Sequence, residues 1–428
     1  MPNRSKTDYL HMVRSPVQSH WRTQRTLARR LQRTRPGLNP FSIFLSVNFW
    51  GWIYNYLKSR VGKKHPFLDY SGAASNGIFK MVSHSALTND HIKIALAADW
   101  ATDTPESKYV GQLMHREGCD YTIHLGDIYF VGTPQEVSDN FFGPDAPWPK
   151  GSSGSLAVPG NHEYYSNGNP YFKLLLPHLF ASHPGGGHYR QEASFFCLEN
   201  NHWRLIALDN GYYSVGPLLI EYIFKPDAHL DDKLIRWLEK VINPEPEPGK
   251  PEPDKPDPRG IVILSHIQYC SAFEGQYPRA AEVLNKIFPG KEVIWIWGHE
   301  HRFAVYNRYQ SPNGIAAYGR CIGHGGMPVE IGKIRDHKEQ HTLPKPKKRC
   351  GCSLVCYDDR KKETIGKTIL GYNGYATLTL DHNRLLIEYR DTETWIFREE
   401  WAVDPETGRL ANTSTRNPDV PLTFPDDE

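Results

Sequence analysis

Five short apolar runs between residues 92 and 297 constrain the fold of this chain more than any other feature. Runs of this kind are typical of strands that are buried on both faces of a sheet. They cover residues 92–98, 121–125, 155–158, 261–264 and 293–297, and helix-like stretches occur at 106–117, 231–242 and 279–288. Strand and helix signals that alternate in this way predict an α/β core.

Two further patterns indicate antiparallel strands. Two apolar runs within residues 193–209 flank an Asn-Asn pair, which predicts a hairpin. Residues 375–401 contain three segments in which apolar and polar residues alternate, as in a β meander. We therefore expect mixed sheets.

A potential metal ligand follows each of the five runs within one to three residues. These residues are Asp99, Asp127, Asn161, His266 and the pair His299 and His301. Because the carboxyl ends of strands line the ligand crevice of an α/β sheet, we expect these side chains to converge. Gly126, Gly160 and Gly298 precede three of them, where the backbone must turn sharply without a side chain in the way.

The residue types suit a site for two metal ions. Two cations about 3.5–4 Å apart can clamp a phosphate, and they need a carboxylate that bridges them. Asp127 is the natural bridge. In an extended segment His299 and His301 project to the same side, so each can bind one metal. Imidazoles favour zinc, iron or manganese over magnesium alone, and Asn161 adds a neutral oxygen.

His162 and Glu163 follow Asn161 and are the expected acid–base residues. His162 need not be a ligand and can protonate the leaving oxygen as a general acid. Glu163 is then expected to orient the imidazole. With Asp127 they make up the predicted catalytic residues.

The ordered set resembles the calcineurin-like metallophosphoesterase superfamily, which includes purple acid phosphatases and Ser/Thr phosphatases. The family pattern appears here as Asp99, Gly126-Asp127, Gly160-Asn161-His162-Glu163, Ser265-His266 and Gly298-His299-Glu300-His301. The resemblance implies a four-layer αββα sandwich and hydrolysis of phosphoesters by a water that two metal ions activate.

The resemblance also implies how the ligands are divided. The first metal would be held by Asp99, Asp127 and His301. The second metal would be held by Asp127, Asn161, His266 and His299.

The chain departs from the family at one ligand. Many members have D-x-H where this chain has Asp99-Trp100-Ala101, so a histidine is missing. Purple acid phosphatases use the tyrosine of GDxxY instead, but here Phe130 occupies that position and Tyr129 comes one place early. The first site therefore needs water or another group, and we name Asp103 and Tyr129 as candidates.

Three functions remain open. Glu163 after Gly-Asn-His is commoner in the monoesterase branches of the family, which favours a phosphatase. A phosphodiesterase or nuclease is the alternative, because a basic arm suits an anionic polymer. A binding scaffold that keeps the fold without turnover is an alternative of another class, since Ala101 leaves one metal loosely held.

The expected organisation has three parts. Residues 1–85 form a basic and apolar, helical extension, residues 86–405 the catalytic domain, and residues 406–428 a tail. Two segments within the domain look like insertions: the Pro-rich stretch 243–259 and the Lys-rich stretch 333–367. The second contains Cys350, Cys352 and Cys356, which are either free thiols or, with His337 and His341, zinc ligands.

The extension has an unusual charge. Residues 1–64 carry 13 Lys or Arg and one acid, whereas the rest of the chain carries 37 basic and 47 acidic residues. Such an arm can contact nucleic acid or an anionic membrane surface, and an uncharged Trp- and Tyr-containing stretch at 36–57 suits an interface. A solvated tail and a helix packed on the domain are the alternatives.

The cysteines and the start of the chain bear on the compartment. Seven scattered cysteines favour a reducing compartment. The first apolar run begins far from Met1, so the sequence does not predict a signal peptide. We expect a cytoplasmic protein, with peripheral membrane contact through residues 1–64 as one alternative.

Overall fold

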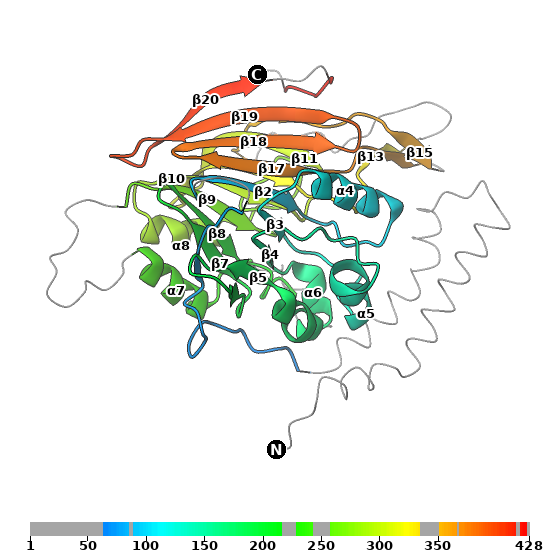
Figure 1. Cartoon of the computed structure of the whole chain (residues 1–428). Helices are drawn as coiled ribbons and strands as arrows, with labels where there is room; N and C mark the ends of the chain where they lie inside the picture. The colour runs from blue at the N-terminus through cyan, green and yellow to red at the C-terminus, as the bar shows by residue number, and fades with distance from the viewer. Residues whose placement is uncertain are drawn as a thin grey trace, which may run out of the picture. The chain divides into compact units, whose positions relative to one another are not determined.

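The computed structural model describes residues 63–84, 89–215, 228–242, 257–333, 351–365, 368–416 and 420–425. Within Gly62–Glu428, which forms one compact unit, two large β sheets pack face to face and helices cover their outer faces (Figure 1). The expected four-layer α/β arrangement with mixed sheets is confirmed.

The first sheet has eight strands in the order β1-β7-β8-β9-β10-β12-β11-β14. Their bounds are β1 Ile78–Lys80, β7 Phe196–Glu199, β8 Trp203–Leu208, β9 Gly260–Ser265, β10 Glu292–Trp297, β12 Ala316–Ile322, β11 Phe303–Gln310 and β14 Leu354–Tyr357. Strands β8, β9, β10 and β12 are parallel to one another. Strands β7 and β8 form the predicted antiparallel hairpin.

The second sheet has nine strands in the order β20-β19-β18-β17-β2-β3-β4-β5-β6. Their bounds are β20 Leu410–Arg416, β19 Trp395–Val403, β18 Arg384–Asp391, β17 Gly374–Asp381, β2 His91–Ala97, β3 Tyr121–His124, β4 Gly154–Ala157, β5 Phe180–Ser182 and β6 His188–Arg190. Strands β2, β3 and β4 are parallel, and β17, β18 and β19 form the predicted antiparallel meander. A small third sheet joins β13 Glu330–Lys333, β16 Thr368–Leu370 and β15 Glu363–Ile365.

Successive side chains along each strand face opposite sides of the sheet, so each central strand contributes to two cores. Ile94 and Leu96 of β2 face the core between the two sheets, where Val262 and Leu264 of β9 also lie. The residues between them face outward: Ala95 of β2 belongs to a separate core on the outer side of the nine-stranded sheet. Central strands are thus buried on both faces, as their continuous apolar runs predict.

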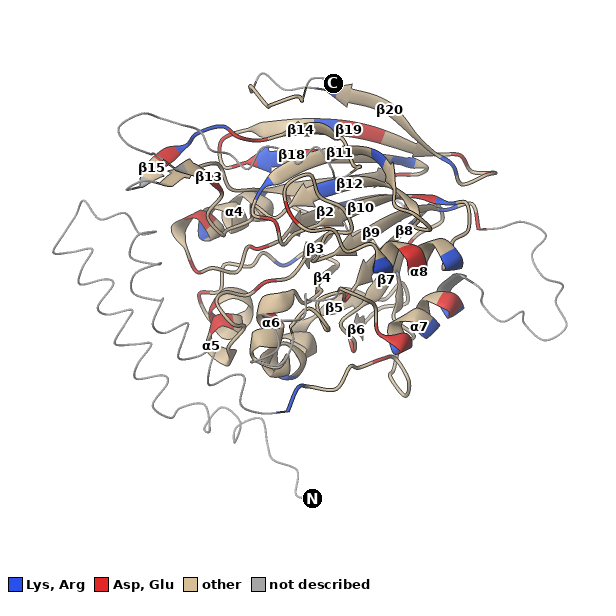
Figure 2. Cartoon of the chain, turned by 180° about the vertical axis from the view of Figure 1, so that it is seen from behind, with Lys and Arg blue, Asp and Glu red and all other residues tan. Residues whose placement is uncertain are grey.

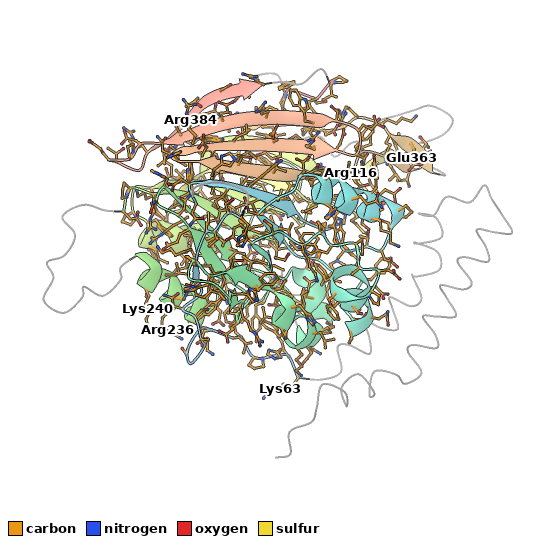
Figure 3. The ribbon with its side chains drawn as sticks, viewed as in Figure 1. Lys63, Arg116, Arg236, Lys240, Glu363 and Arg384 are labelled. Carbon is orange, nitrogen blue, oxygen red and sulfur yellow. The ribbon has the colours of Figure 1, made fainter. Side chains whose placement is uncertain are left out.

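The helices cover the outer faces. Their bounds are α4 Pro105–Arg116, α5 Pro134–Val137, α6 Asn161–Tyr165, α7 Asp232–Ile242 and α8 Arg279–Ile287, with π-helical turns at Ser138–Phe142 and Tyr171–Leu175 and a 3-10 turn at Leu176–His178. Helices α7 and α8 bury Leu234 and Leu284 against the eight-stranded sheet. Charged residues gather on the other sides of α7 and α8 (Figure 2), and Arg116 and Arg236 lie at the outside of the domain (Figure 3).

The sheets extend beyond the segments that we expected them to occupy. β1 lies within 1–85 and pairs with β7, and β20 lies within 406–428 and pairs with β19. β14, from the expected insertion 333–367, pairs with β11. These strands use the unpaired edges of sheets whose centres are built from the apolar runs.

Several expectations lie outside the described residues: the structure of the arm up to residue 62, most of the Pro-rich stretch 243–259, and Cys350 with His337 and His341. Cys352 and Cys356 are described and buried, and Gln276 Nε2 donates to Cys352 Sγ at 3.9 Å, so the zinc site stays a prediction. Among the described residues, no helix is long and apolar enough to cross a membrane.

Candidate metal centre

The six expected ligands come together where the carboxyl ends of strands from both sheets meet. Asp99, Asp127 and Asn161 follow β2, β3 and β4 of the nine-stranded sheet. His266 follows β9, and His299 with His301 follows β10, in the other sheet. The site is therefore built across the interface between the sheets, and packing of the sheets decides its geometry.

One half of the site gathers around His266. Its Nε2 atom lies 3.2 Å from Asp127 Oδ2 and 3.2 Å from Asn161 Oδ1. Ligand atoms of Asp127, His266 and His299 all lie within 4.8 Å of one another. The Nδ1–H of His266 donates to the carbonyl of Leu125 at 2.8 Å, which directs Nε2 into the site.

The other half gathers around the hydroxyl of Tyr129. This oxygen lies 2.7 Å from Asp99 Oδ1, 3.0 Å from Asp127 Oδ2 and 2.9 Å from His301 Nε2. His301 Nε2 and Asp99 Oδ1 are themselves 3.5 Å apart. Among the two candidates named for the first site, Tyr129 therefore lies next to Asp99, Asp127 and His301.

The distances fit metal coordination. Neighbouring ligand atoms in an octahedral site with bonds of about 2.1 Å are separated by roughly 3.0 Å. The Tyr129 hydroxyl lies 2.7–3.0 Å from its three neighbours, and His266 Nε2 lies 3.2 Å from Asp127 Oδ2 and Asn161 Oδ1, which is close to this value. Asp127 Oδ2 belongs to both groups. The donor set of carboxylates, imidazoles, a phenol and an amide is therefore of a kind that can hold metal ions.

Buried negative charge also favours cations at this place. Asp99 and Asp127 are 0% and 1% exposed. Within the described residues, their hydrogen-bond and ion-pair partners are backbone N–H groups, Tyr129 and imidazoles, without a Lys or Arg. Two buried carboxylates that share a hydrogen-bond donor require positive charge to offset their desolvation.

The imidazoles supply that charge when no metal is bound. Burial opposes the charged form of His266, but the adjacent Asp127 carboxylate raises the pKa of His266 to about 10. Burial lowers the pKa of His299 to about 4, so this ring is neutral. Despite burial, His266 and His162 hold the pKa of Asp127 well below its usual range.

Metal uptake at the second site is consequently expected to depend on pH. His266 carries a proton at neutral pH and must lose it to bind a metal. Because the pKa of His266 is raised, a proton competes with the metal for this imidazole below about pH 10. The apparent affinity of the second site for a metal ion should therefore rise roughly tenfold per pH unit between about pH 6 and 8. Chelator competition for Mn²⁺ at several pH values measures this slope, and a flat profile would contradict the assignment of His266.

The backbone at the site adopts unusual conformations. Asp99, Asp127 and His299 have φ angles of 54°, 70° and 66°, in a left-handed region that few residues other than glycine enter. Gly160 is required by close approach, because a Cβ atom there would lie 2.2 Å from Asp127 Oδ1. Strained ligands held by surrounding packing are typical of a functional site.

Glu163 has a different role from the one expected. Its carboxylate accepts backbone N–H groups of Asp127 at 3.1 Å and of Ile128 and Gly160. It therefore joins the loop after β3 to the loop after β4 and does not orient His162, so that expectation is wrong. Burial and the Asp127 charge raise the pKa of Glu163 to about 8.

His162 is held by a backbone carbonyl instead. Its Nδ1–H donates to Phe130 O, and its Nε2 lies 3.7 Å from Asp127 Oδ2. The side chain is 19% exposed, so a substrate can reach it. Burial lowers the pKa of this imidazole although Asp127 opposes the shift.

The two candidates for completing the first site differ in their contacts. Asp103 forms a 2.8 Å ion pair with Lys108, whereas Tyr129 contacts the first-site ligands directly. Ala101 is fully buried and pairs with Ile128 in a parallel bridge, and its carbonyl accepts the N–H of Tyr129. The local pairing places Tyr129 in the site although its sequence position differs from GDxxY.

We expect Tyr129→Phe to weaken the first metal by about 10–100-fold while the second stays bound. The hydroxyl is a donor to the first site only, and a phenylalanine keeps the packing. Metal content after dialysis, compared with Tyr171→Phe, checks this; Tyr171 is a buried tyrosine whose hydroxyl donates to Ala157 O at 2.8 Å. A gain of metal in Tyr129→Phe would show that the hydroxyl occupies the place of the metal.

Sequence reasoning missed two residues beside the site. Asp209 and Asn210 follow β8, are 0% and 2% exposed, and contact the ligand loops. The signal was a sixth apolar run, Trp203–Leu208, that ends in polar residues. The hairpin pattern that this run also forms does not by itself point to these two residues.

Comparisons with known proteins agree with this architecture. Residues 92–303 match the sequence model of the calcineurin-like phosphoesterase family. No curated protein matches the sequence.

Three solved structures are similar to the chain at low identity. "GAP50 the anchor in the inner membrane complex of Plasmodium" is 13% identical with a TM-score of 0.45, and the match covers 75% of this chain and 91% of that one. PhoD is 14% identical with a TM-score of 0.45, with 78% and 73% covered. Purple acid phosphatase PPD1 from yellow lupin (Lupinus luteus) seeds is 15% identical with a TM-score of 0.39, with 71% and 52% covered.

Proposed function

Because residues 92–303 form a domain of the calcineurin-like phosphoesterase family, we propose that this protein hydrolyses phosphate esters with the help of two metal ions. The observation that carries the proposal is the pair of donor groups that share Asp127 Oδ2. The first group is Asp99, Tyr129, Asp127 and His301. The second group is Asp127, Asn161, His266 and His299.

Metal ions bound by these groups would polarise the phosphoryl oxygens and make a water more acidic. The side chains of the protein position the substrate and the metal ions, and one of them protonates the leaving oxygen. Asp127 holds both halves of the site together through its shared carboxylate. Asn161 contributes a neutral oxygen, which limits the negative charge that a phosphate substrate meets.

His162 is the proton donor in this proposal. Its Nδ1–H is bound to Phe130 O, so Nε2 is the atom that delivers a proton to the leaving oxygen. Nε2 faces the site, as its separation of 3.7 Å from Asp127 Oδ2 indicates. Protonation by His162 matters most for esters whose leaving alkoxide is a strong base.

We propose phosphomonoesters as the substrate class, on the basis of Glu163 in the Gly-Asn-His-Glu segment. Phosphodiesters are the alternative. A binding scaffold without turnover is the alternative of another class.

A substrate panel distinguishes the three. Metal-free protein receives Mn²⁺, Zn²⁺, Fe²⁺ or Mg²⁺ and is assayed with phosphomonoesters and phosphodiesters side by side. Release of phosphate from monoesters in a metal-dependent manner supports the proposal. Metal binding without hydrolysis of either class would favour the scaffold, and faster cleavage of diesters would replace the monoester assignment.

A further inference from the structure

Asp209 and Asn210 lie at the carboxyl end of β8, next to the metal centre but outside its donor groups. Strand β8 neighbours β9 in the eight-stranded sheet, and its end lies beside the loop that begins with His266. Both side chains are buried, at 0% and 2% exposure. Buried polar groups of this kind require partners, and their partners include Tyr164 and Ile267, which lie next to metal-ligand candidates.

Asn210 clamps the peptide that follows His266. Its Nδ2 donates to the carbonyl of Ile267 at 2.7 Å, and its Oδ1 accepts the N–H of Ile267 at 3.0 Å. The side-chain amide of Asn210 thereby holds both the backbone N–H and the backbone carbonyl of Ile267. Since Ile267 is covalently joined to His266, the clamp limits how far the backbone of this ligand can move.

Asp209 holds the other side of the site. Its Oδ2 accepts the hydroxyl of Tyr164, which lies in α6, the short helix that begins with Asn161. Its Oδ1 accepts the N–H groups of Gly211 at 3.1 Å and Tyr212 at 3.0 Å, so the carboxylate is itself fixed. The end of β8 thus contacts a helix that follows β4 of the nine-stranded sheet.

The two contacts converge on one pair of ligands. Asn161 comes from one sheet and His266 from the other, and their ligand atoms approach to 3.2 Å. We infer that Asp209 and Asn210, together the β8 brace, are positioning residues that set the affinity of the second metal by holding Asn161 and His266 at this separation. The inference rests on the proposed function, because it concerns a metal of that site.

The expected loss of metal affinity can be estimated from other residues that hydrogen-bond to metal ligands and orient them. Loss of a group that orients a metal ligand usually costs about 10–100-fold in metal affinity. Asn210→Ala also leaves two buried backbone groups unsatisfied, which destabilises the fold locally. A control must therefore reproduce the destabilisation without touching a ligand.

Asn200 offers this control at the opposite end of the same strand. It is buried, and its Oδ1 accepts the N–H groups of His202 at 2.9 Å and Trp203 at 2.8 Å. Asn200→Ala removes two hydrogen bonds to backbone, as Asn210→Ala does. It leaves the carboxyl end of β8 unchanged.

The test measures Mn²⁺ affinity by chelator competition, together with metal content and the Mn²⁺ dependence of turnover. We expect Asn210→Ala to weaken one of two metals by about 10–100-fold and Asn200→Ala to leave both unchanged. Saturating Mn²⁺ should restore most of the turnover of Asn210→Ala, because the ligands themselves are present. Equal Mn²⁺ affinities in the wild type and Asn210→Ala would overturn the brace.

A second variant keeps the test decisive if Asn210→Ala does not fold. Tyr164→Phe removes only the hydroxyl that Asp209 accepts, and it should weaken the same metal by a smaller factor. Unchanged affinity in Tyr164→Phe would then overturn the part of the brace that acts through Asn161. A wild type that binds no metal would instead overturn the proposed function, together with the brace.

Discussion

Asp127→Asn should remove both metals and lower turnover by at least about 10³-fold, the upper range for the loss of one electrostatic group in an active site. The carboxylate lies within 3.2 Å of donors in both halves of the site, and its charge is shared between them. An amide has no charge to share. Asparagine tolerates the left-handed backbone at this position, so the fold should remain.

Asp103→Asn is the matched control for this variant. Asp103 also has a left-handed backbone, with a φ of 55°, and its carboxylate forms an ion pair with Lys108. Metal content and turnover of Asp103→Asn should equal those of the wild type. Turnover near the wild-type value in Asp127→Asn would contradict the two-metal assignment.

His162→Ala should lower turnover by about 10²–10⁴-fold, the usual contribution of a positioned acid or base. Metal content should stay constant, because Nε2 is 3.7 Å from Asp127 and Nδ1 is bound to Phe130 O. The defect should shrink for aryl phosphates, whose leaving groups need little protonation. Comparison of an alkyl and an aryl ester on the same metal-loaded variant measures this difference.

His178→Ala controls for loss of an imidazole in general. The Nδ1 of His178 bonds to the carbonyl of Leu174 at 2.8 Å, and its ring stacks on Phe142, so its local contacts resemble those of His162. It lies in the Leu176–His178 turn and not in the donor groups. If His162→Ala loses metal while His178→Ala does not, His162 is a ligand and another group is the acid.

The apolar runs and the ligands after them could be predicted from sequence because their determinants are local. Buried strands such as β9 require continuous apolar residues. A ligand such as Asp127 follows a glycine because the chain must leave the sheet within one or two residues, and Gly126 has a φ of 93°. Both signals are short-range, and the structure shows that the runs become strands whose ends meet.

The role of Glu163 depended on contacts that short-range signals do not contain. Adjacency to His162 suggested that the carboxylate orients the imidazole. In the fold, helix α6 directs the carboxylate toward the N–H of Gly160 and toward the N–H groups of Asp127 and Ile128 in the loop after β3. Neighbouring residues in a helix point in different directions, so adjacency in sequence was a poor guide.

An α/β core with mixed sheets and the order of the potential ligands follow from local sequence patterns, because burial and tight turns act within a few residues. Three contacts depend instead on the packing of the sheets. Tyr129 approaches Asp99, the β8 brace contacts the helix that begins with Asn161 and the peptide after His266, and β20 extends the nine-stranded sheet. Each of these contacts joins residues on separate strands or sheets. Their formation depends on how the sheets pack and which edges remain open, and this is a property of the whole core and not of any segment.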